Sequence, residues 1–110
     1  MSDSPKRVEA KDRILTAARA LLDGKLDTLK ASSEIARCRH DLDPNQTDPD
    51  LLAFAGIESQ VDHLLMASLE GWHPSVREQK EAEYSEAERF FRAGALESAR
   101  ALVLRYHRPA

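Results

Sequence analysis

The stretch from Asp48 to Leu64 constrains the fold more than any other part of this chain. It opens with Asp48-Pro49-Asp50, which is typical of a helix start: Thr47 or Asp48 can cap the first amides, and proline is favoured at the first helical position. An apolar face with i, i+3, i+7 and i+10 spacing follows, made of Phe54, Ile57, Val61 and Leu64. This spacing predicts a helix over about 49–65 whose apolar face lies at the centre of the core.

The other segments also repeat apolar residues at helical spacing, and none alternates as a β-strand would. Alanine, leucine, glutamate and arginine, all good helix formers, dominate the composition. We expect one all-α domain over residues 1–110, folded as a largely antiparallel bundle of four to five helices. The further helices are expected at about 5–23, 26–42, 74–92 and 94–107.

Local signals indicate where the helices begin and end. Ser4 is expected to cap the first helix, and Gly24 is expected to follow its end in a left-handed conformation. The apolar faces of 74–92 and 94–107 are offset around Ala93-Gly94. This offset predicts a break or a kink at that point, with one long helix as the alternative.

Two apolar stripes identify the core faces of the first two helices. Val8, Leu15 and Leu22 recur every seven residues in the first helix. The stripe of the second consists of Ala31, Ile35, Cys38 and Leu42. Because Cys38 lies within that stripe, it is interpreted as a small buried side chain rather than a reactive thiol.

The charge balance argues against several classes of partner. The chain has 16 basic and 19 acidic residues and a net charge of −3, so it lacks the basic field that nucleic-acid binding requires. No run approaches the roughly 20 apolar residues of a membrane span. A single cysteine fits a reducing compartment. We expect a cytoplasmic protein that binds neither nucleic acid nor membrane.

No local catalytic, metal-binding or nucleotide-binding motif is present in the sequence. The acidic loop around Asp48 lacks the central glycine of a calcium loop, and its aspartates are interpreted as caps and turn formers. No cofactor or metal is therefore expected. A small metal-dependent or hydrolytic enzyme using Asp62 and His63 is kept as an alternative, since distant residues can assemble a site.

The candidate interaction residues surround the central apolar stripe. Gly56 and Ser59 are small and would let another backbone approach closely, while Glu58 and Asp62 lie one turn apart and repel slightly unless a basic group faces them. Trp72 is expected to pack on the core, with an exposed anchor for a partner as the alternative. The full set consists of Asp48, Asp50, Gly56, Glu58, Ser59, Asp62, His63 and Trp72.

Acid-rich surfaces and the missing motifs favour a non-enzymatic protein-binding module. The helix expected at 74–92 carries glutamates on its polar faces, namely Glu78, Glu81, Glu83, Glu86 and Glu88. Together with the acidic loop, they would complement a basic protein, as in an immunity or antitoxin protein. A homodimer joined through an uncovered helical face is a second alternative.

The sequence resembles a family of short, uncharacterised bacterial helical proteins. Its members share a DPD(L/F)xxFxGIxSxxDHL motif, a following tryptophan and an alanine-rich C-terminal helix that ends in Arg-Tyr. Here the motif runs from Asp48 to Leu64, and Arg105-Tyr106 corresponds to the Arg-Tyr pair at the end of the C-terminal helix. Where similar sequences have a proline and a glycine after the DHL, this chain has Leu65-Met66-Ala67. The resemblance implies a discrete bacterial helical domain and transfers no catalytic residue.

Overall fold

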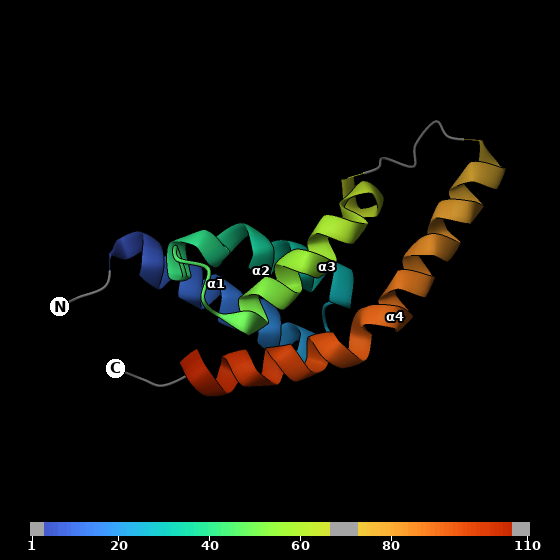
Figure 1. Ribbon diagram of the computed structural model, residues 1–110. Coiled ribbons are helices and arrows are strands. Elements are labelled where there is room, and N and C mark those ends of the chain that lie inside the picture. The colour runs from blue at the N-terminus through green and yellow to red at the C-terminus, as the bar shows by residue number, and fades with distance from the viewer. Residues whose placement is uncertain (1–3, 67–72, 107–110) are drawn as a thin grey trace.

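The computed structural model describes residues 4–66 and 73–106, without the side chains of His63, Leu65 and Met66. All regular secondary structure in this part of the chain is α-helical, and no strand occurs in it. Its four helices are α1 (Pro5–Leu22), α2 (Thr28–Leu42), α3 (Pro49–Met66) and α4 (Pro74–Tyr106) (Figure 1). An all-α helical bundle is thus confirmed, and its largely antiparallel packing stays a prediction.

The helix ends follow the local signals closely. Ser4 caps α1, and its hydroxyl accepts a 3.2 Å hydrogen bond from the amide of Arg7. Gly24 has a φ of 76°, the left-handed conformation expected after a helix end. The second helix begins at Thr28, two residues later than expected, because Asp27 serves as its cap and accepts a 2.8 Å bond from the Lys30 amide.

One apolar core joins all four helices. The predicted stripe of α2 is confirmed, and Cys38 within it is buried. In α3 the stripe residues Phe54, Ile57 and Val61 are buried, whereas Leu64 is half-buried. The assignment of Val8 to the core face of α1 is wrong, since this side chain is 48% exposed in the first turn of the helix. The largest fully buried apolar side chains are Phe54, Ile14, Leu21, Leu29, Ile35, Leu51 and Leu102.

The separation of the C-terminal region into two helices is also wrong. Residues 74–106 form one helix of 33 residues, and both Ala93 and Gly94 are helical. Figure 1 shows a continuous ribbon that changes direction near its middle. The offset between the two apolar faces is therefore accommodated by bending the helix rather than by breaking it. This one helix contacts each of the other three.

Two helix-interior glycines provide a test of local stability. Gly56 and Gly94 are both exposed, and a β-carbon built on either would meet no atom within 4 Å. The close backbone approach expected at Gly56 is thus absent from the described residues. Alanine restricts the unfolded chain, so Gly56→Ala and Gly94→Ala should each raise the free energy of unfolding by about 0.5–1 kcal/mol in urea denaturation.

Gly24→Ala is the matched control for these two substitutions. Its site is equally open, but its positive φ disfavours a β-carbon. Alanine there should lower the free energy of unfolding by about 1 kcal/mol. A stabilised Gly24→Ala variant, or destabilised helix variants, would contradict this account of the three glycines.

Candidate functional site

The start of α3 depends on the carboxylate of Asp48, which is only 6% exposed. Its Oδ1 accepts hydrogen bonds from the amides of Asp50 at 2.9 Å and Leu51 at 3.3 Å. These are two of the amides that a helix start leaves without a partner inside the helix. The predicted capping role is confirmed, with Asp48 rather than Thr47 as the cap.

The other oxygen of Asp48 connects the start of α3 to the end of α4. Its Oδ2 accepts 2.7 Å bonds from Nη1 of Arg105 and from the hydroxyl of Tyr106. The second guanidinium nitrogen of Arg105 forms an ion pair with Asp50. Two of the eight predicted interaction residues, Asp48 and Asp50, therefore have partners within the chain, 55 or more residues away.

The acidic loop before α3 is an ordered turn. The carboxylate of Asp43 accepts bonds from the Asp48 amide at 2.7 Å and from the Thr47 hydroxyl at 3.0 Å. The backbone hydrogen bond from Asp48 is the main cause that lowers the pKa of Asp43 below its usual range. This loop thus uses its carboxylates for its own geometry, as turn-forming aspartates commonly do.

A second polar cluster lies at the start of α2. The carboxylate of Glu88 on α4 accepts bonds from the amides of Thr28 at 2.9 Å and Leu29 at 3.3 Å. The hydroxyl of Tyr84 donates a 2.7 Å bond to Asp27, the residue that caps α2. Glu88 was expected on a solvated face, but it supplies the negative charge favoured at a helix N-terminus. Nothing local in the sequence indicates this distant partner.

Three predicted interaction residues do meet in one place. Glu58, Ser59 and Asp62 line a groove of about 400 Å³ between α2 and α3. The α2 side lines the same groove with basic residues. Its residues are Ala36, Arg37, Arg39 and His40. The groove therefore presents charges of both signs, with Asp62 and His40 exposed at its surface.

The enzyme alternative stays a prediction. The side chain of His63 and all of Trp72 lie outside the described residues, so neither can be placed beside Asp62. Within 4–66 and 73–106, no group of three or more histidine, cysteine, aspartate or glutamate side chains is arranged to hold a metal ion. Burial raises the pKa of the Cys38 thiol, which agrees with its interpretation as a buried core side chain.

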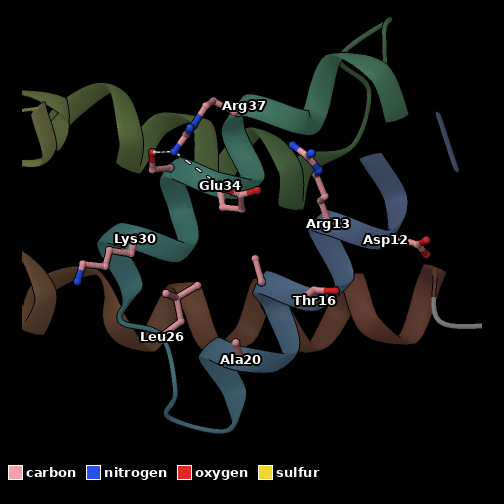
Figure 2. Close-up of a pocket in the computed structure, with 10 residues that line it drawn as sticks. Asp12, Arg13, Thr16, Ala20, Leu26, Lys30, Glu34 and Arg37 are labelled. Carbon is pink, nitrogen blue, oxygen red and sulfur yellow. Dashed lines mark hydrogen bonds and ion pairs between the residues drawn. The ribbon is translucent and has the colours of Figure 1, made fainter. Parts of the chain in front are cut away.

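Another groove, of about 630 Å³, lies between α1 and α2 (Figure 2). Three of its charged residues form ion pairs within their own helices: Arg13 bonds Glu9 at 3.0 Å, and Arg37 lies 3.9 Å from Glu34. Figure 2 shows Lys30 pointing away from the middle of the groove. Because charges of both signs line this groove, it offers no field of a single sign with which to select a partner.

The contact between α3 and α4 is different in character. Two hollows lie along it, and both are lined by Phe90 and Phe91. The outer hollow, about 450 Å³, is completed by Gln60, Val61, Leu64, Glu83, Glu86 and Ala87. The inner hollow, about 360 Å³, is completed by Asp50, Ala53, Ile57, Gly94, Ala95, Glu97 and Ser98. We call these two hollows together the α3–α4 seam.

Phe90 is the most exposed large apolar side chain in this part of the molecule, at 79%. Its ring packs edge-on against Phe91, with ring centres 4.9 Å apart and planes at 86°. Phe91 is half-buried, whereas Phe90 projects from the surface and was not among the predicted interaction residues. The signal was present, because neighbours on a helix point about 100° apart and only one of two adjacent phenylalanines can face the same core.

Comparison with known proteins gives no family and no fold relative: no family model, no curated protein and no solved structure matches the chain. The family resemblance of the DPD motif stays a prediction. Among the described helices, none combines the length and the apolar composition needed to cross a membrane. The candidate site is therefore judged on its own geometry.

Replacing Asp48 should remove the hydrogen bonds that join the start of α3 to the end of α4. Asp48→Ala removes the α3 cap and leaves Arg105 and Tyr106 without their acceptor. We expect the free energy of unfolding to fall by about 2–4 kcal/mol in urea denaturation. The exposed Asp62→Ala variant is the control and should change it by less than about 0.5 kcal/mol. Similar small changes in both variants would refute the structural role of Asp48.

The ionisation of Tyr106 at alkaline pH should provide a second test of its contact with Asp48. Burial, followed by the hydrogen bond to Asp48, raises the pKa of Tyr106 to about 12. In the unfolded chain, the tyrosine hydroxyl ionises with a pKa of about 10. The contribution of Tyr106 to the free energy of unfolding is therefore complete below about pH 10 and is lost as the pH rises through 12. In Tyr84→Phe, which leaves one tyrosine, ultraviolet absorbance should give a midpoint near 12 for the folded protein. A midpoint near 10 in folded protein would contradict the buried contact.

Proposed function

We propose that this protein is a non-enzymatic protein-binding module, immunity- or antitoxin-like, whose α4 surface meets a basic protein. The observation that carries the proposal is the exposure of Phe90 between two hollows whose charged lining residues are all acidic. Aromatic side chains dominate the energy of many interfaces, and acidic surroundings favour a cationic partner. A cytoplasmic location and a bacterial origin accompany this proposal as expectations.

The acidic loop plays a smaller part in this proposal than the sequence suggested. Asp43, Asp48 and Asp50 all have partners inside the chain, which leaves little of their charge for another protein. On α4, by contrast, Glu86 and Glu97 are exposed and line the two hollows. The binding surface is therefore assigned to the junction of α4 with α3.

Phe90→Ala tests the proposal directly. Wild-type protein immobilised on beads should retain a basic protein from an extract of its source cells. Loss of an aromatic anchor costs about 2 kcal/mol or more, so the variant should bind roughly 30-fold less tightly. Binding of the retained protein is then quantified by titration against both forms.

Leu104→Ala is the matched control. Leu104 is 75% exposed on the same helix but lines neither hollow of the α3–α4 seam. This variant should bind like wild type, and the helical content of both variants should match wild type by circular dichroism. Retention of the same proteins by wild type and both variants would reject the α4 surface as the binding site.

A further inference from the structure

The α3–α4 seam has the surface of a site for one more helix, because its lining combines apolar residues with acidic ones. Its floor is apolar: Val61, Leu64 and Ala87 line the outer hollow, and Ile57 and Ala95 line the inner one. Phe90 separates the two hollows as a projecting side chain held against Phe91. A partner must therefore offer apolar side chains on both sides of a single aromatic ridge.

The charges around this floor are of one sign. The charged residues lining the seam are Asp50, Glu83, Glu86 and Glu97. Asp50 pairs with Arg105 and Glu83 with Lys80, at 3.3 Å. Among the described residues, Glu86 and Glu97 have no ion pair, and both are exposed. These two carboxylates are the ones able to attract a cation from outside.

Glu86, Phe90 and Glu97 lie on one face of α4. Steps of four and eleven residues return a helix to within about 40° and 20° of its starting direction. At about 1.5 Å per residue, the two glutamates are separated by roughly 16 Å along the helix, with the aromatic ring between them. The face thus has an acid at each end and an apolar centre.

We propose that the seam binds an amphipathic helix of a partner protein, with apolar residues on one side and lysine or arginine about three turns apart. This inference rests on the proposed function and specifies its partner. A helix fits because a groove between two helices accepts the ridge of a third. Helices offer no unpaired strand edge, so the partner cannot add as a β-strand.

The charge pattern also selects against a second copy of this chain. A symmetric dimer places the same patch of both molecules face to face. Glu86 and Glu97 would then meet a surface whose charged lining is equally acidic, which is unfavourable. The seam therefore fits a basic helix better than it fits itself.

A synthetic peptide tests this specificity. The probe is a fluorescent helical peptide of about 18 residues made of alanine, leucine and lysine, with leucines on one face and two lysines eleven residues apart. A control peptide has the same composition with its leucines dispersed around the helix. Fluorescence anisotropy should show at least tenfold tighter binding of the amphipathic peptide to the wild-type protein.

Variants of the protein locate the binding. Phe90→Ala should weaken binding of the amphipathic peptide at least tenfold. The double variant Glu86→Gln/Glu97→Gln should weaken it about fivefold and reduce its salt dependence. Glu78→Gln/Glu81→Gln removes the same charge from α4 residues that line neither hollow, and it should bind like wild type.

Four outcomes would overturn the inference. Equal binding of both peptides would show general attraction to an acidic surface, and equal loss in both double variants would place the contact outside the seam. Light scattering that shows a dimer of the wild type, dissociated by Phe90→Ala, would identify a second copy as the occupant. If the cell extract yields a Phe90-dependent partner but the amphipathic peptide does not bind, the proposed function stands and the helical partner is rejected.

Discussion

The arrangement of α3 and α4 depends on the hydrogen bonds that the carboxylate of Asp48 accepts. One oxygen serves the first turn of α3, and the other holds the guanidinium of Arg105 and the hydroxyl of Tyr106. A buried carboxylate is tolerated only when its oxygens are bonded, and here both of them are. The chain therefore fixes its central helix and its C-terminal helix through one side chain.

At the start of α2, a carboxylate again accepts hydrogen bonds from free backbone amides, but this carboxylate belongs to α4. There the carboxylate comes from α4, as Glu88, and reaches the free amides of Thr28 and Leu29. Tyr84, one turn earlier, bonds the local cap Asp27. α4 is consequently fastened at two helix starts by charge-assisted hydrogen bonds, in addition to its contribution to the core. These two points determine how α4 lies on α3, and so they shape the seam.

Local chemistry in the sequence was enough to predict most of the fold. The caps at Ser4 and Asp48, the left-handed Gly24 and the apolar stripes all depend on residues close together in the chain, and they were predicted. The partners of Arg105 and Glu88 are more than 50 residues away, so no local pattern could reveal them. Continuity through Gly94 was only an alternative in the sequence analysis, because a bend and a break leave the same offset between the apolar faces.

The long-range hydrogen bonds at the starts of α2 and α3 divide α4 into two parts of unequal stability. Between Tyr84 and Tyr106 the helix is held by long-range bonds and by the buried Ala95, Ala99 and Leu102. From 74 to 83 most side chains are exposed, and helix hydrogen bonds provide nearly all of the order. Amide protons should thus exchange with solvent along a gradient, fastest in the outer turns and slowest near Ala99. Phe90 lies near the outer end of the part of α4 that is held by long-range contacts. A ligand bound there would therefore slow amide exchange in the adjoining outer turns, along a helix that is already formed.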